Sequence, residues 1–122
     1  MRSFGERIRP AVDRELRLAD MSASPREAFK HLERAHVLGQ ASTFHHVRVH
    51  CRMLVWGFTQ HDAREIFGQL LRIIGAATKT AFGLVPTGNT GGSDISPFKP
   101  LPIPDDLSRD LRGAQERAHG PS

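Results

Sequence analysis

The sequence predicts an all-α protein with four main helices arranged as antiparallel, bundle-like hairpins, followed by an extended C-terminal arm. Three observations lead to this fold class. Up to residue 83, apolar residues recur at spacings of three and four. That region also contains residues typical of the beginnings and ends of helices. From residue 84 the chain becomes rich in Gly and Pro, which do not continue a helix. We therefore expect a helical bundle over residues 1–83 and an arm over residues 84–122, within a single domain.

The first helix is expected over about residues 3–20. Its apolar stripe consists of Phe4, Ile8, Val12, Leu16 and Ala19. Pro10 lies inside this span, so either it kinks the helix or the regular part begins near it.

The second helix begins in the segment SASPREAF. Ser24 is the candidate N-cap, Pro25 occupies the first helical position, and Glu27 completes a capping box. Its expected buried face consists of Ala28, Phe29, Leu32, Ala35 and His36. We expect the helix to end near Gly39, as a left-handed C-cap.

Two further helices follow after short connectors, so each should run antiparallel to the helix before it. Ser42 or Thr43 is the expected cap of the third helix, and Thr59 or Asp62 that of the fourth, which should run to about Phe82. The apolar stripe of the third helix, expected to face the core, is Val47, Cys51, Leu54, Val55 and Phe58. The corresponding stripe of the fourth helix is Ile66, Phe67, Leu70, Ile73, Ile74 and Ala77.

The arm contains apolar residues spaced as anchors on the bundle: Val85, Ile95, Phe98, Leu101 and Ile103. The alternative is an ordinary disordered tail. A short terminal helix is expected to start at Asp105 or Asp106. Within the arm, the segment PTGNTGGSD lacks the lysine of a phosphate-binding loop. It is either an anion-binding nest involving Thr90, Ser93 and Asp94 or, as we favour, a set of turns.

Composition narrows the function classes. The formal charge of +4 comes from basic residues interspersed with acidic ones, which does not favour nucleic-acid binding. No apolar run approaches the ~20 residues that cross a membrane. The N-terminus lacks the apolar core of a signal peptide, and the single cysteine, Cys51, forms no internal disulfide. We therefore expect a cytoplasmic protein with no membrane contact, and a homo-oligomer remains open.

Histidines cluster around the connector between the second and third helices. His36 lies about four residues before the middle of the turn, and His46 about five after it. In an antiparallel pair these residues sit at nearly the same level, with Glu33 and His50 one turn deeper. We therefore predict that Glu33, His36, His46 and His50 converge on one point.

Three imidazoles and one carboxylate suit Zn²⁺, Fe²⁺, Mn²⁺, Co²⁺ or Ni²⁺. Glu33-x-x-His36 also has the spacing found in di-iron bundles, but the chain has one such motif where the di-iron pattern needs two, so a single ion is favoured. Cys51 and Met53 would favour Cu⁺, although a core role for Cys51 is the simpler interpretation. The competing interpretation of the whole group is a buried hydrogen-bond network of His and Glu.

The stretches LERAHVLGQ, HHVRVHCRML and GLVPTGNTGG resemble a small bacterial family of helical proteins with a domain of unknown function. The resemblance covers about Ala28 to Leu107. Its signature includes the positions of His36, Gln40, His46 and His50 and the GNTGG loop. It implies a compact helical protein and no established activity.

We therefore expect a transition-metal-binding protein with its site between the second and third helices. Gln40 or Gln69 is a candidate hydrogen-bond partner of the ligands. An enzymatic form would activate water or dioxygen at an open coordination position, whereas a carrier or sensor would only hold the ion. Whether it is an enzyme stays open. The alternative is a non-catalytic protein-interaction or self-associating helical module with structural histidines.

Overall fold

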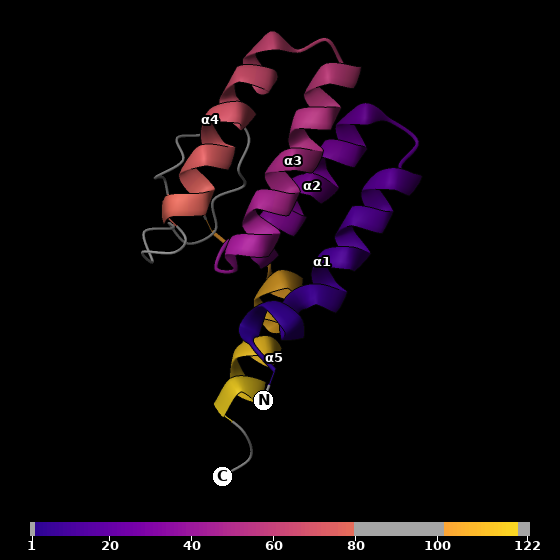
Figure 1. The fold of residues 1–122 in the computed structure, drawn as a ribbon. Helices are drawn as coiled ribbons and strands as arrows, with labels where there is room; N and C mark the ends of the chain where they lie inside the picture. The colour runs from indigo at the N-terminus through magenta and orange to yellow at the C-terminus, as the bar shows by residue number, and fades with distance from the viewer. Residues whose placement is uncertain (1, 80–101, 120–122) are drawn as a thin grey trace.

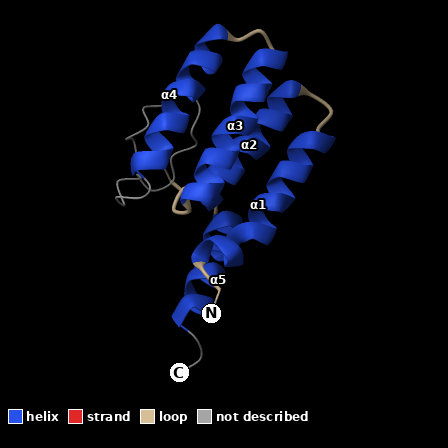
Figure 2. Cartoon of the chain, in the orientation of Figure 1, coloured by secondary structure: helices blue, strands red, loops and turns tan. Residues whose placement is uncertain are grey.

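Five helices make up the computed structural model, which describes residues 2–79 and 102–119 and has no strand in these ranges (Figure 2). They are α1 (Phe4–Met21), α2 (Pro25–Gly39), α3 (Thr43–Thr59), α4 (Ala63–Lys79) and α5 (Asp105–His119). The predicted all-α class is confirmed. In Figure 1, α1 to α4 run side by side and reverse direction at each connection, while α5 lies beside the N-terminal half of α1. Residues 84–101 of the predicted arm, with the glycine loop, lie outside the described residues. Ile103, one of the predicted anchors, is half buried and packs against the core.

Each of the first four helices starts at a polar cap. In α1, Ser3 accepts from the backbone N–H of Glu6, whose carboxylate accepts from the backbone N–H of Ser3. Ser24 and Ser42 cap α2 and α3, as predicted. Asp62 caps α4, accepting from the backbone N–H of Glu65 at 3.0 Å. Side-chain acceptors satisfy first-turn N–H groups that have no partner within the helix.

Two local expectations need correction or refinement. Gly39 is not a left-handed cap, because α2 continues through it and Gln40 follows in helical conformation. A Cβ atom at Gly39 would stand 2.7 Å from Cβ of His45, so glycine lets α2 and α3 approach closely. Pro10 is not the start of the regular part, because α1 begins at Phe4 and runs through it.

The apolar core lies where α1, α2 and α3 meet, with α5 closing one end. The predicted stripe of α1 is buried from Ile8 onward, and so are Leu32 and Ala35 of α2. The buried hydrophobic residues are Ile8, Val12, Leu16, Ala19, Leu32, Ala35, Val37, Leu38, Val49, Met53, Leu107 and Ala114. Burial of these side chains is the main force that assembles the helices.

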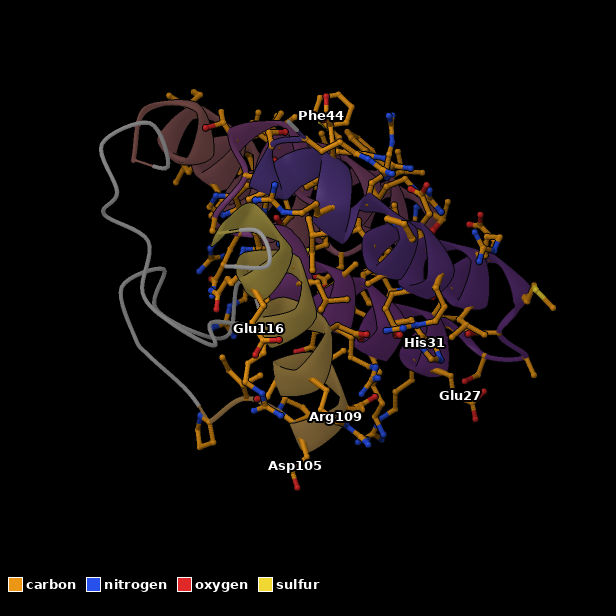
Figure 3. All side chains as sticks on the ribbon, turned by 90° about the horizontal axis from the view of Figure 1, so that it is seen from below. Glu27, His31, Phe44, Asp105, Arg109 and Glu116 are labelled. Carbon is orange, nitrogen blue, oxygen red and sulfur yellow. The ribbon has the colours of Figure 1, made fainter. Side chains whose placement is uncertain are left out.

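The predicted inward stripes of α3 and α4 are wrong in part, because several of their residues are exposed. Cys51, Val55 and Phe58 are exposed on α3, and Figure 3 shows Phe44 on the outer surface as well. The residues of α3 that face inward are His45, His46, Val49, His50, Met53 and Gly57. On α4, Glu65 and Gln69 are buried, while the exposed large apolar residues are Phe67, Leu70, Leu71 and Ile74.

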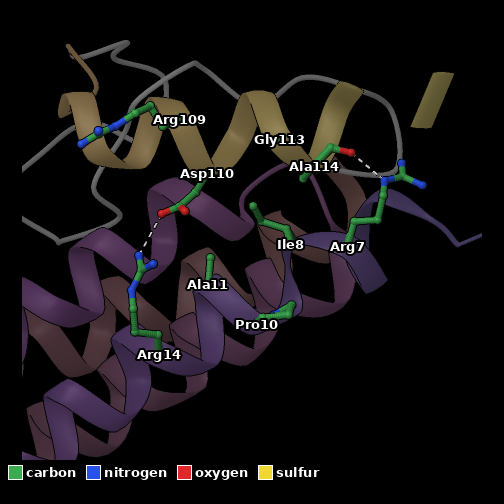
Figure 4. A pocket seen from close by; sticks show the side chains of 9 residues that line it. All are labelled: Arg7, Ile8, Pro10, Ala11, Arg14, Arg109, Asp110, Gly113 and Ala114. Carbon is green, nitrogen blue, oxygen red and sulfur yellow. Dashed lines mark hydrogen bonds and ion pairs between the residues drawn. The ribbon is translucent and has the colours of Figure 1, made fainter. Parts of the chain in front are cut away.

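Helix α5 is held on α1 by polar contacts that Figure 4 shows along the groove between them. Nε of Arg7 donates to the carbonyl oxygen of Ala114 at 2.6 Å, and Arg14 pairs with Asp110 at 2.9 Å. Leu107 packs fully buried beneath them. The C-terminal helix is therefore part of the folded unit.

A buried carboxylate joins α1 to α2. Glu15 is 1% exposed, and its oxygens lie 2.8 to 2.9 Å from nitrogens of Arg34, His31 and Arg14. Burial alone would raise the pKa of Glu15, but the hydrogen bonds from these three residues outweigh it and lower the pKa.

Among the described helices, none is long and apolar enough to cross a bilayer.

Candidate metal centre

Five polar side chains fill the space where α2, α3 and α4 meet. Their exposed fractions lie between 0% and 7%, which is unusual for such residue types. They are His36, His46, His50, Glu65 and Gln69. Buried polar groups need partners, so the geometry of this cluster determines what it can do.

The three histidines converge. His36 comes from the last turn of α2, and His46 and His50 come from successive turns of α3. Ring centroids are 4.7 to 4.8 Å apart for all three pairs. One nitrogen from each ring can be chosen so that all three lie within 4.8 Å of one another. The predicted convergence of these imidazoles across the α2–α3 connection is therefore present in the structure.

A hydrogen-bond chain from α4 orients His50. Nε2 of Gln69 donates to Oε2 of Glu65 at 2.8 Å, which turns the side-chain oxygen of Gln69 toward the imidazole. That oxygen only accepts, so Nδ1 of His50 donates to it. Nε2 of neutral His50 then carries a lone pair, and it lies 3.1 Å from Nε2 of His36. Glu65 and Gln69 thus fix the tautomer of His50.

Burial keeps the histidines of α3 uncharged. It lowers the pKa of His46 to about 3, and the neighbouring His50 acts in the same direction. Burial also lowers the pKa of His50 to about 4, although the hydrogen bond with Gln69 opposes this shift. Neutral imidazole is the form that binds metal ions. At pH 7 both rings are therefore in the ligand form without needing to lose a proton.

Glu33, the carboxylate predicted to converge with the histidines, is not part of the group that the described residues form. It instead lines an open groove between α2, α3 and α4, together with Phe29 and Trp56. Glu33 and His36 are one turn apart on α2, but Glu33 is only half buried. The structure thus brings together three of the four predicted residues and places Glu33 at the rim.

The remaining candidates lie elsewhere. Cys51 is exposed and Met53 is fully buried in the apolar core, and neither belongs to the histidine group. His45 lies next to His46 in the sequence but points toward α1, where its Nε2 donates to the carbonyl oxygen of Gly5 at 2.8 Å. Burial lowers the pKa of His45 too. His45 therefore joins α3 to α1, and its neighbour His46 faces the centre.

This arrangement has two chemical uses. Without an ion, His36 can donate from Nε2 to the lone pair of His50, which extends the hydrogen-bond chain that starts at Glu65 and Gln69. With an ion, both Nε2 atoms can turn their lone pairs toward it. A tetrahedral zinc site with Zn–N bonds of about 2.0–2.1 Å separates its nitrogens by about 3.3 Å. The observed 3.1 Å is close to that value.

Sequence reasoning named Gln69 only as one of two possible partners, and it assigned Glu65 no role here. The signal that could have found them is their i, i+4 spacing on α4, opposite the apolar residues. That pattern is also typical of a solvent-exposed face.

In a comparison with family models, DUF3703, described as a protein of unknown function, matches residues 6–111. No curated protein and no solved structure matches the chain.

Proposed function

The chain belongs to the DUF3703 family, and from the geometry of its buried histidines we propose that it binds one transition-metal ion through His36, His46 and His50. The observation that carries this proposal is the 3.1 Å separation of two Nε2 atoms, one of which has its lone pair directed inward by Gln69. One nitrogen from each of the three imidazoles can be chosen so that all three lie within 4.8 Å of one another. Three imidazole nitrogens suit Zn²⁺, Fe²⁺, Co²⁺ or Ni²⁺.

The polar residues behind His50 support the same proposal. A metal-binding histidine almost always donates its other N–H to a carboxylate, a carbonyl oxygen or water, which fixes the ring and makes it a better ligand. Here an amide oxygen accepts that proton, and a buried carboxylate holds the amide. Three ligands leave one position of a tetrahedral ion for a further donor. Water or dioxygen would bind there in an enzymatic form, while a carrier or sensor needs only the binding step.

Metal content tests this proposal directly. We expect protein purified without a histidine tag and loaded with Zn²⁺ or Co²⁺ to retain about one ion per chain after gel filtration, by elemental analysis. At an ion concentration 100 times the Kd, binding adds about 2.7 kcal/mol of stability. For a chain of this size that corresponds to a rise in Tm on the order of 10 °C. Protein that retains no metal and shows no rise with any of these ions would contradict metal binding.

A second function is favoured by the outer face of α4, and we propose it as self-association. Among the described helices, α4 packs only against α3. Phe67, Leu71 and Ile74 lie along one side of α4 and are each 69% to 73% exposed. Contiguous exposed apolar patches larger than a few hundred Å² are uncommon on monomeric proteins and mark interaction sites. A two-fold axis would place the row against its own copy, which makes a second copy of the chain the proposed partner.

Replacing Leu71 with Glu is expected to separate this dimer. A charge buried at the centre of an apolar interface costs several kcal/mol, so the dissociation constant should rise more than 100-fold. Light scattering coupled to gel filtration measures the mass across a dilution series.

The control is Met21→Glu, which changes another exposed apolar residue, on α1 and away from this row. It should leave the mass unchanged. A wild-type protein that is monomeric at all concentrations would contradict self-association, and it would leave the metal proposal untouched.

A further inference from the structure

The centre described so far has three donors, and Gln40, four residues after His36 in the sequence, is a further buried polar residue at the end of α2. Gln40 is 7% exposed. Its side-chain oxygen is buried and accepts no hydrogen bond from any residue within the described ranges. Leaving a buried acceptor unsatisfied costs on the order of 1–3 kcal/mol. A polar atom kept at such a cost often has a functional role.

The position of Gln40 links it to the histidines. It follows His36 by four residues, which places both on one face of the same helix, about one turn apart. It also stands at the end of α2, directly before the tight connection in which the N–H of Ser42 donates to the carbonyl oxygen of Gly39 at 2.9 Å. His46 lies in the first turn of α3, just beyond this connection. Gln40 is therefore at the end of the centre closest to the α2–α3 connection.

We propose that the side-chain oxygen of Gln40 is the fourth donor of the centre, so that three nitrogens and one oxygen hold the ion. The inference rests on the proposed metal binding. Gln40 takes the place that sequence analysis gave to Glu33, with an important difference in charge. All four donors are neutral, and the nearest carboxylate of the hydrogen-bond chain, Glu65, is separated from the ion by Gln69 and His50.

The donor set has consequences for selectivity. A neutral set of three imidazoles and one amide oxygen favours borderline divalent ions, such as Zn²⁺ and Co²⁺, over the soft Cu⁺ that thiolate and thioether ligands select. The bound ion also keeps its full positive charge. The filled fourth position makes this a closed site, which is typical of ions held for folding, storage or sensing.

The test compares Gln40→Leu with Gln40→Glu, using Co²⁺ as the probe. Gln40→Leu removes the oxygen, so we expect a fall in Co²⁺ affinity of about 10–100-fold. This is less than the loss expected for an imidazole, because a neutral amide oxygen is a weaker ligand and water can take its place. The visible absorption of bound Co²⁺ should change because its coordination changes. Gln40→Glu keeps an oxygen at this position and should bind Co²⁺ at least as tightly as the wild type.

The melting temperatures of the metal-free variants should change in the direction opposite to their Co²⁺ affinities. Leu removes the unsatisfied acceptor, so metal-free Gln40→Leu should melt a few degrees above the wild type, whereas Gln40→Glu, with a charge at a buried position, should melt below it. Gln60→Leu is the matched control, because Gln60 also follows a helix end but is exposed. It should change neither affinity nor spectrum.

The outcomes separate the two proposals. Wild-type protein that binds no Co²⁺ overturns both. Wild-type protein that binds Co²⁺, with the same affinity and the same spectrum in Gln40→Leu, overturns only the role of Gln40. Loss of affinity in Gln40→Leu together with retention in Gln40→Glu supports it.

Discussion

His50→Phe is expected to reduce metal affinity by more than about 100-fold, because it removes a ligand outright, and the loss of a supporting group alone costs about 10–100-fold. Phenylalanine keeps a planar ring of similar size in a buried position, so the packing between α3 and α4 is largely retained. His46→Phe should have a similar effect, since its ring is one of the three that converge. Titration with Zn²⁺ followed by calorimetry measures the affinity, and elemental analysis measures the stoichiometry.

The control for both variants is His61→Asn. His61 is exposed and lies outside the histidine group, in the connection between α3 and α4, where its φ is +55°. Asparagine tolerates positive φ better than most residues, so the backbone need not change. This variant should bind one ion as the wild type does. If His50→Phe or His46→Phe still retained one ion per folded chain, the ion would bind elsewhere.

Circular dichroism separates lost binding from lost folding. Phe at position 50 leaves the side-chain oxygen of Gln69 without its present donor, which costs roughly 1–3 kcal/mol. A domain of this size has about 5–15 kcal/mol of stability, so the variant should stay helical. Metal-induced rises in Tm should then be absent, although the helical signal persists.

The helices and their caps could be predicted because they depend on local chemistry. Ser24, Ser42 and Asp62 can satisfy first-turn N–H groups whatever surrounds them. The convergence of His36, His46 and His50 could also be predicted, because a short connector fixes the level of each residue in an antiparallel pair.

The orientation of α3 and α4 could not be predicted in the same way. Rules based on periodicity place the apolar face of a helix inside the protein. Two faces of α3 satisfy such a rule: one contains Val49 and Met53, and the other contains Val55 and Phe58. The structure buries the first pair, on the same side as the histidines. Polar residues face inward because they satisfy one another, as Glu65, Gln69 and His50 do. That mutual satisfaction is a property of three residues on two helices, and no single helical pattern contains it.

Glu33 was misplaced for a related reason. Counting residues from the turn of a hairpin gives the position of a residue along the helix axis. The direction in which its side chain points depends on the rotation of the helix about that axis. His36 and Glu33 differ by three residues, or about 60° around α2. That difference is enough to leave the histidine buried and to put the carboxylate in a groove.

Acid should begin to destabilise the metal-free protein at a pH above that at which carboxylates are protonated. In the unfolded chain His46 and His50 have a pKa near 6.5, whereas in the folded chain burial lowers these values to about 3 and about 4. Below pH 6.5 the unfolded state therefore binds more protons, and stability falls as the pH falls. Each imidazole contributes about 1.4 kcal/mol per pH unit. Two of them remove roughly 5 kcal/mol between pH 6.5 and 4.5, which is comparable with the total stability.

The charged groups around these rings do not reverse this sign. From α4, Arg72 lowers the pKa of His50, Glu65 raises it, and burial prevails. His45 acts in the same direction as the other two rings. The lowered pKa of Glu15 means that its contribution is lost only as the pH falls below about 4.5, the value expected in the unfolded chain. The interval from pH 6.5 to 4.5 therefore reports mainly on the buried imidazoles.

Denaturant unfolding at a series of pH values, with EDTA present, measures the effect. We expect a slope near 2.7 kcal/mol per pH unit from His46 and His50 together, and about half of that in His46→Phe. His61→Asn should follow the wild type, because it leaves the buried imidazoles unchanged. A free energy of unfolding that stays level from pH 7 to pH 5 would mean that the rings accept protons in the folded protein. The cluster would then be open to water, and the neutral ligand set on which metal binding depends would be lost at mildly acidic pH.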